Sequence, residues 1–268
     1  RVIDHQDAAN GTRYLQRLQA VLAAEQQADP AGLQGLAATR EAARWLALWM
    51  AFDDIVRVAD LKRRASRWQR VRAETRATDG ELLKVWEHFK PGLPELAGLL
   101  PAAWAGRLLA IDQRRQARGQ APWAFALRLG THTMHGQLAL AALAGLRWLR
   151  PHGQRWAAEQ AGIERWLRAV EAGLRQHPRL GLELARCGRL NKGYGDTHAR
   201  AHAALDHLLA QFGDSTVIAD PAARADALAQ ARTAALADAG GQALDQALRA
   251  DGAAPRPLKE QPIRWMRR

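Results

Sequence analysis

Apolar residues recur along most of the chain at the three- and four-residue spacing that places them on one face of a helix. Ala, Leu, Arg, Gln and Glu are abundant, and these residues lose little entropy in a helix. β-Branched residues are sparse, and Ser215–Ala219 is the one short strand candidate. The predicted helices are one ending before Asp29-Pro30, one from about 33 to 61, five beginning near Pro101, Pro122, Pro151, Pro178 and Pro221, one through Leu205–Phe212, and a short one after Gly240-Gly241.

This pattern predicts an all-α fold, an irregular bundle of about eight or more helices with no significant sheet. Residues 1–252 are expected to form the helical domain. The irregular stretch 78–101, with Lys90-Pro91-Gly92 and Pro94, is the predicted place for a boundary between subdomains. Residues 253–268 contain three prolines, which predict an extended tail rather than a helix.

The chain carries 39 Lys or Arg against 27 Asp or Glu, a formal net charge of +12. Such a charge is typical of proteins that bind nucleic acid through its phosphates. Here, however, the cations are mostly Arg, are spread along the chain, and accompany much Ala and Gly, as GC-rich coding produces. The alternative function is therefore a basic helical module for nucleic acid or an acidic protein, and it requires cations gathered on one face.

A single cysteine, Cys187, excludes an internal disulfide framework, a four-cysteine zinc site and an iron–sulfur cluster held by this chain alone. The most apolar run, 138–146, is half the length of a membrane-spanning helix. The first residue is Arg1 and not an initiator methionine, and no signal-peptide pattern follows it. We therefore expect the sequence to be a piece of something longer.

The ten tryptophans are mostly at helical spacing. Trp45 and Trp49, for example, are one turn apart, so most of these rings are expected to anchor the packing of helices. Trp68 and Trp265 are the exceptions because arginines surround them. They are candidates for stacking by Arg at the surface or for contact with a partner, and packing within the fold is favoured for Trp68.

Asp53-Asp54 interrupts an apolar helical stretch. Adjacent helical positions point about 100° apart, so at least one of the two carboxylates is expected near the buried side. A partly buried carboxylate needs a partner, and Arg57 lies one turn away. An ion pair on the helix surface or between helices, for which Arg57 is available, is therefore the favoured prediction over an acid–base pair.

Two histidine pairs have spacings that metal ions can use. His132 and His135 are three residues apart, whereas His198 and His202 are four apart with Asp206 one turn further. The HExxH signature is absent and the pattern imposes no third ligand, so no metal site is predicted.

The least ordinary segment is Asn191–Arg200. Two glycines flanking Tyr194 are expected to end one helix, and Asp196 or Thr197 can cap the next. The free N–H groups of a helix start, with cationic side chains nearby, suit a phosphate or carboxylate. A purely structural corner is the competing interpretation, and spacing alone favours it. The candidate site for an anion or coenzyme comprises Lys192, Gly193, Tyr194, Gly195, Asp196, Thr197, His198 and Arg200.

The same segment, Lys192–His198 with Arg200, resembles a stretch near the C-terminus of indolepyruvate ferredoxin oxidoreductases. Five further similarities follow in the family's order, and together they span essentially the whole chain. They are Arg1–Ala9 with Tyr14-Leu15, Asp54–Lys62, Phe89–Gly92 with Glu95-Leu96, Ala158–Gln160 with Ile163-Glu164 and Trp166-Leu167, and Pro262–Trp265. The chain thus resembles the helical region that follows the gamma domain in the beta-subunit family of these enzymes.

The resemblance implies one part of a cytoplasmic 2-oxoacid oxidoreductase. Such enzymes decarboxylate aryl pyruvates on thiamine diphosphate, transfer the acyl group to coenzyme A, and pass electrons through iron–sulfur clusters to ferredoxin. It further implies that this chain holds no cofactor and no complete active site. Its implied partners are a gamma-type domain of the same subunit and an alpha-type subunit or domain carrying thiamine diphosphate and iron–sulfur clusters. A helical domain supporting assembly of that complex is therefore expected.

Overall fold

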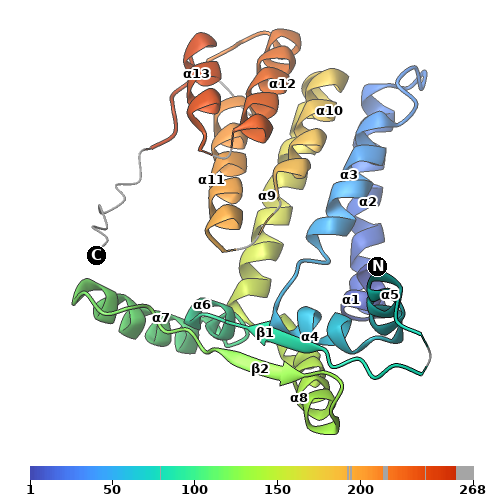
Figure 1. The fold of residues 1–268 in the computed structure, drawn as a ribbon. Helices are drawn as coiled ribbons and strands as arrows, with labels where there is room; N and C mark the ends of the chain where they lie inside the picture. Colours follow the sequence, from blue (N-terminus) through green and yellow to red (C-terminus); the bar gives the residue numbers. More distant parts are fainter. Residues whose placement is uncertain (79, 192, 194, 214–216, 239, 258–268) are drawn as a thin grey trace. The chain divides into compact units, whose positions relative to one another are not determined.

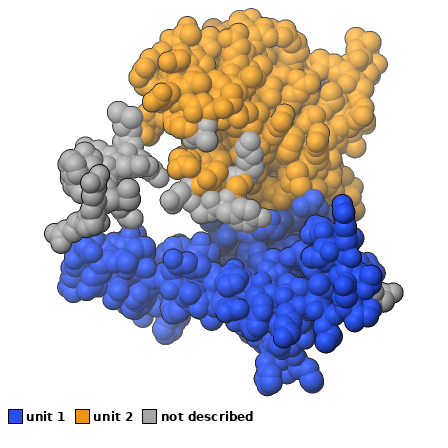
Figure 2. Space-filling view, in the orientation of Figure 1, with its two compact units in different colours: residues 1–11, 50–162 blue, residues 12–49, 163–268 orange. Residues whose placement is uncertain are grey.

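The computed structural model describes residues 1–78, 80–191, 193, 195–213, 217–238 and 240–257. These residues contain thirteen α-helices, two short 3₁₀ helices and one two-stranded sheet, which confirms the predicted all-α class (Figure 1). The chain divides into two compact units, residues 1–11 with 50–162 and residues 12–49 with 163–268 (Figure 2). The predicted boundary region 78–101 falls inside the first of these, which we call unit 1; the second is unit 2.

Unit 1 holds the two-stranded sheet, and its α8 packs on α4. Its elements are α1 (Val2–His5), the start of α2 (Ala8–Ala28), α4 (Ile55–Arg63), α5 (Ala65–Thr75), β1 (Trp86–Phe89), α6 (Leu93–Ala97), α7 (Ala102–Ala117), β2 (Leu127–Gly130), α8 (Met134–Gly145), η1 (Leu146–His152) and the start of α9 (Gln154–Gln176).

Unit 2 is a bundle of long helices, in which α10 packs on both α3 and α12. Its core includes Leu46, Trp166, Leu184 and Leu208, all fully buried. Its elements are the rest of α2, α3 (Ala37–Trp49), the rest of α9, α10 (Pro178–Cys187), η2 (Gly188–Leu190), α11 (Gly195–Phe212), α12 (Pro221–Ala237) and α13 (Gln242–Ala250).

Proline and cap residues begin several helices as predicted. Pro178 and Pro221 occupy the first helical position of α10 and α12, where the missing N–H costs nothing. The side chain of Asp220 accepts hydrogen bonds from the first backbone N–H groups of α12. These starts depend on neighbouring residues only, which is why the sequence predicts them.

The helix predicted over 33–61 is wrong as a single element. The structure ends α3 at Trp49 and begins α4 at Ile55, because Asp54 caps α4 by accepting a hydrogen bond from the backbone N–H of Arg57 at 2.7 Å. The bound carboxylate satisfies an N–H that a helix start otherwise leaves without a partner. A new helix therefore starts inside a continuous apolar pattern.

The predicted ion pair is confirmed for Asp54, but its partner is Arg150 and not the available Arg57. The guanidinium of Arg57 contacts Asp4 at 2.8 Å and Asp60 at 3.2 Å. The carboxylate of Asp54 instead pairs with Arg150, with the Nε and an oxygen 2.6 Å apart. Asp60 is one turn from Arg57, whereas Asp4 and Arg150 lie far along the chain from their partners, where a one-turn spacing argument cannot find them.

The helix predicted from Pro122 begins twelve residues late. Residues 127–130 form β2, which runs antiparallel to β1 with Trp86 opposite Gly130 and Phe89 opposite Leu127. Thr133 then caps α8, its hydroxyl accepting from the N–H of Gly136 at 3.1 Å. A strand partner forty residues earlier leaves no mark on local periodicity. The prediction of no significant sheet therefore misses this one small ribbon.

Tryptophan burial also departs from the prediction. Among the nine tryptophans that the structure describes, only Trp49, Trp156 and Trp166 are buried, while four are exposed and two are half-buried. The exposed ones are Trp86, Trp104, Trp123 and Trp148. Helical spacing identifies one face of a helix but does not say whether another element covers it.

The remaining predictions concern the C-terminal part. Val217–Ala219, the described end of the strand candidate, is not in a strand, and Ser215 lies outside the described residues. Residues 253–257 have no regular structure, as predicted for the tail, and 258–268 lie outside the described residues. None of the helices, as far as the structure describes them, has the length and hydropathy needed to cross a bilayer.

Candidate functional site

The predicted anion site lies where the chain enters α11 in unit 2. Thr197, His198 and Arg200 occupy the first two turns of this helix. Lys192 and Tyr194 lie outside the described residues. Of Gly195 and Asp196 only the backbone is described, so the carboxylate of Asp196 is not placed. The structure therefore places three of the predicted side chains at one helix start.

Gly193 sets the geometry of this corner. Its φ of +92° lies in the region that side chains other than glycine rarely adopt. A Cβ at this position would also lie 2.8 Å from the Cγ2 of Thr197. The glycine therefore allows the close approach of the preceding turn to α11, as the sequence predicted for a corner.

A pocket of about 80 Å³ opens beside this corner, within unit 2. Its polar side chains are Thr197, Arg200, Asp238 and Arg256, so residues from α11 meet residues that follow α12 and α13. Leucines and alanines form the apolar part of the wall. These are Leu190, Ala201, Ala204, Ala235, Leu236 and Leu244.

The charges around the pocket are largely compensated. Arg256 forms an ion pair with Asp245, its Nε 3.0 Å from a carboxylate oxygen. Asp238 accepts backbone hydrogen bonds from Ala243 and Gly240, which lower the pKa of its carboxyl group and keep it ionised. Arg200 donates to the hydroxyl of Thr197 at 3.3 Å.

The size of the pocket limits what it can hold. On this measure a single water molecule needs about 10–15 Å³, so the pocket has room for a group larger than water, such as a carboxylate or a single phosphate group. Pockets for drug-sized ligands and cofactors measure about 300–1,000 Å³. The space among the described residues is smaller than such pockets, and binding of an anion or a coenzyme at this corner stays a prediction.

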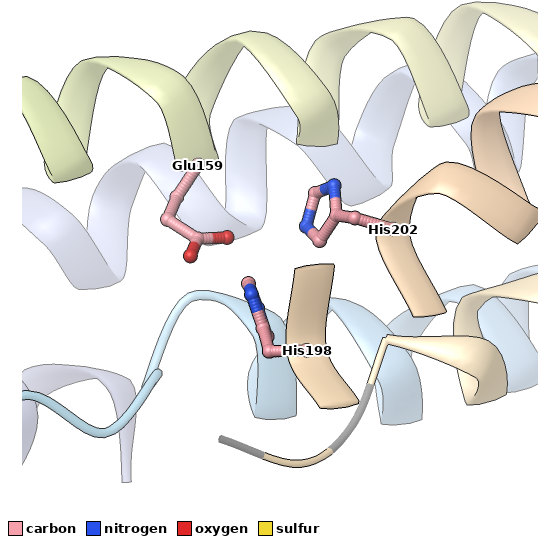
Figure 3. A group of neighbouring side chains, drawn as sticks. All are labelled: Glu159, His198 and His202. Carbon is pink, nitrogen blue, oxygen red and sulfur yellow. The ribbon is translucent and has the colours of Figure 1, made fainter. Parts of the chain in front are cut away.

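The second histidine pair also lies on α11. The imidazole rings of His198 and His202, drawn in Figure 3, have their centroids 4.8 Å apart. The ring of His202 also meets that of Trp49 edge-on, with the centroids 5.1 Å apart. Glu159, the third side chain drawn there, belongs to unit 1. Within the described residues of unit 2, no further Cys, Asp, Glu or His joins the pair. Zinc sites use three or four protein ligands, so the pair alone does not make one.

The first histidine pair is not brought together as a site. The Nδ1 of His132 lies 3.1 Å from the carbonyl oxygen of Val85, and its ring meets Trp86 edge-on. His135 is exposed on the first turn of α8. The two imidazoles therefore have separate surroundings, one in the turn between β2 and α8 and the other on the exposed surface of α8.

Cys187 is fully buried at the end of α10, and burial raises the pKa of its thiol to about 12. Because only the thiolate reacts or binds metal, this shift lowers the reactive fraction by about a thousandfold relative to the ordinary value of 9.0. We expect native protein to be inert toward a thiol-reactive chromogenic disulfide near pH 8, and protein unfolded in guanidinium chloride to react within seconds to minutes. Equal rates in the two states would contradict the burial.

The comparison with protein families matches residues 1–211 to DUF6537, described as a family of unknown function. The chain belongs to the DUF6537 family. No curated protein and no solved structure matches it. In this DUF6537 chain, Thr197 and Arg200 lie in the matched part, whereas Asp238 and Arg256 follow it. The pocket thus combines residues within the matched range with residues that follow it.

Local sequence patterns do not indicate two groups of candidate functional residues in this DUF6537 chain. Arg256 reaches the pocket from the tail, and no local pattern marks it. The exposed tryptophans of unit 1, Trp104 among them, are the second group, because most tryptophan rings of the chain are expected to anchor the packing of helices. The sequence does carry a signal for these rings, since arginines lie three to eight residues away from Trp104 and Trp123.

Proposed function

We propose that the chain is the non-catalytic helical domain of a beta-type subunit in a cytoplasmic 2-oxoacid:ferredoxin oxidoreductase acting on aryl pyruvates such as indolepyruvate. Its role is to support assembly of the catalytic domains. The observation that carries the proposal is the ordered series of segments similar to that family, from Arg1–Ala9 to Pro262–Trp265. Thiamine diphosphate and the iron–sulfur clusters then belong to the partners.

The chemistry of the described residues supports this division of labour. The one cysteine is buried with a raised pKa, so it offers no thiolate to a cluster or an acyl group. The pocket beside α11 accommodates a carboxylate or phosphate group, which matches part of a 2-oxoacid or of a coenzyme but contains no pair of groups for proton transfer. We assign it an auxiliary anion-binding role within the complex.

The test is isolation of the assembly through a tag on this chain from the cells that make it. We expect the preparation to contain bound thiamine diphosphate and the visible absorbance of iron–sulfur clusters, and to reduce a viologen dye when indolepyruvate and coenzyme A are added. The isolated chain, tested in the same assay, should give no reduction. Activity of the chain alone, or a preparation without thiamine diphosphate and clusters, would overturn the proposal.

A further inference from the structure

Residues 82–130 of unit 1, which we call the basic arm, expose an unusual surface. The arm comprises β1, α6, α7 and β2, and Figure 1 shows α7 and the ribbon in green. Large apolar side chains that would ordinarily be buried are exposed along it, and Trp104 has 63 % of its surface accessible. They are Leu82, Trp86, Trp104, Ile111, Trp123, Phe125 and Leu127.

The charged residues of the arm are arranged with one sign outward. None of its three acidic residues is classed as exposed, since Glu87 and Asp112 are buried and Glu95 is half-buried. Its Lys and Arg residues are all exposed except Arg115, which is half-buried. The exposed cations are Lys84, Lys90, Arg107, Arg114, Arg118 and Arg128. The charged side chains of the arm that are classed as exposed are therefore all positive.

Helix α7 concentrates these features on one stripe. Trp104, Arg107, Ile111, Arg114 and Arg118 follow one another at spacings of three or four residues, which place them on one side of a helix. All five are exposed. The buried positions Ala105 and Asp112 lie on another side of the same helix.

Arginines of the arm also stack on its tryptophans. The guanidinium of Arg128 lies 4.3 Å from the ring centroid of Trp86, and that of Arg115 lies 4.8 Å from Trp123. Arg107 lies 5.8 Å from Trp104. A stacked guanidinium keeps its edge N–H groups available for a carboxylate, so charge and apolar area are presented together.

The surface is held in place by main-chain and side-chain hydrogen bonds. Asp112 accepts from the backbone N–H of Trp123 at 2.9 Å, which ties α7 to the segment before β2. The N–H of Phe125 donates to the carbonyl of Pro91, and that of Leu93 donates to the carbonyl of Trp123. A preorganised surface loses less entropy when a partner binds.

We propose that the basic arm is the docking surface for a partner protein whose contact face is apolar and rimmed by carboxylates. This rests on the proposed function, in which the partner is the subunit or domain that carries thiamine diphosphate and iron–sulfur clusters. Tryptophan and arginine are the side chains most enriched among the energetically dominant residues of protein interfaces. The excess of exposed positive charge favours an acidic partner.

Two other occupants fit the surface less well. A second copy of the chain, docked symmetrically through the same surface, would place one arginine-rich patch against another. Nucleic acid would use the cations and the free ring faces, but the exposed aliphatic side chains Leu82, Ile111 and Leu127 contribute neither phosphate contacts nor base stacking. An acidic protein surface uses all three kinds of side chain.

The proposal is tested on the tagged assembly isolated from the producing cells, with the chain alone for comparison. Hydrogen exchange of 102–130 should slow by at least about tenfold in the assembly. The double variant R107E/R114E and the single variant W104A should each weaken association by about tenfold or more, with the charge variant losing most at low salt. The control R63E/R70E makes the same change of charge at exposed positions of α4 and α5 and should bind as the unaltered chain does.

Three outcomes would overturn the docking surface. If the subunit with thiamine diphosphate and clusters is present but 102–130 exchanges as in the free chain and R107E/R114E binds normally, the arm is not the interface, and the proposed function stands. If no such subunit is present, both fail. If the chain alone binds labelled oligothymidylate or phosphatidylserine vesicles, and R107E/R114E abolishes this, the arm serves that ligand instead.

Discussion

Replacing Arg150 by methionine is expected to lower the free energy of unfolding by about 3–5 kcal/mol, as urea unfolding would measure. The guanidinium of Arg150, 2 % exposed, binds both oxygens of Asp54 at 2.6 and 3.0 Å. It also donates to the backbone carbonyl of His5 and to the side chain of Gln6, at 2.7 and 2.8 Å. Removing it leaves a buried carboxylate without its counter-charge, and that carboxylate also caps α4.

The matched control is Arg165→Met. Arg165 pairs with Asp206 at 3.1 Å, but both side chains are nearly half exposed, so its loss should cost at most about 1 kcal/mol. Burial raises the pKa of Asp54, but the hydrogen bonds and charge of Arg150 outweigh burial and the net shift is downward. The pair thus stabilises the fold above pH about 4 and loses this effect as the pH falls further. Equal losses for the two variants at neutral pH would contradict the role of the buried pair.

Replacing Trp166 by alanine is expected to cost about 3–5 kcal/mol of unfolding free energy in unit 2. The ring is fully buried, its centroid lies 5.6 Å from that of Trp49, and its Nε1 donates to the carbonyl of Leu184 at 2.8 Å. Gly188 approaches it so closely that a Cβ there would lie 2.6 Å from the indole. The indole is therefore tightly packed, and we expect Trp166→Ala to leave a cavity that the neighbouring residues do not fill.

Two further variants separate the contributions of Trp166. Trp166→Phe keeps most of the ring area but removes the hydrogen bond to Leu184, and it should cost about 1–3 kcal/mol. Trp148→Ala removes an exposed indole and should change stability by no more than about 0.5 kcal/mol. A loss below 1 kcal/mol for Trp166→Ala, in urea or thermal unfolding, would contradict the packing.

Part of the candidate site follows from the sequence. The corner before α11 is predicted because Gly193 supplies a conformation that other residues avoid, and a helix start after a glycine is a local event. The two histidines on α11 are likewise predicted to share one face from their spacing. What the sequence does not indicate is the opposite wall of the pocket, because Asp238 and Arg256 join it from distant parts of the chain.

The positive surface of the basic arm is a feature that composition alone does not reveal. The net charge of +12 is visible in the composition, and scattered arginines make it look like coding bias. In the folded chain Glu87 and Asp112 are buried, whereas Arg107 and Arg114 are exposed. Positive charge is therefore concentrated on the surface of the arm. Composition counts charges, whereas exposure depends on which side chains find partners.

The sequence alone determines the helical class of this protein, the helix starts at Pro178 and Pro221, and the glycine corner. Each of these depends on backbone conformations and hydrogen bonds within a few residues. Only the tertiary structure decides the break before α4, the pairing of β1 with β2, and the exposure of Trp104. The pair of Asp54 with Arg150 joins residues 96 positions apart, and packing over such distances is what local periodicity does not record.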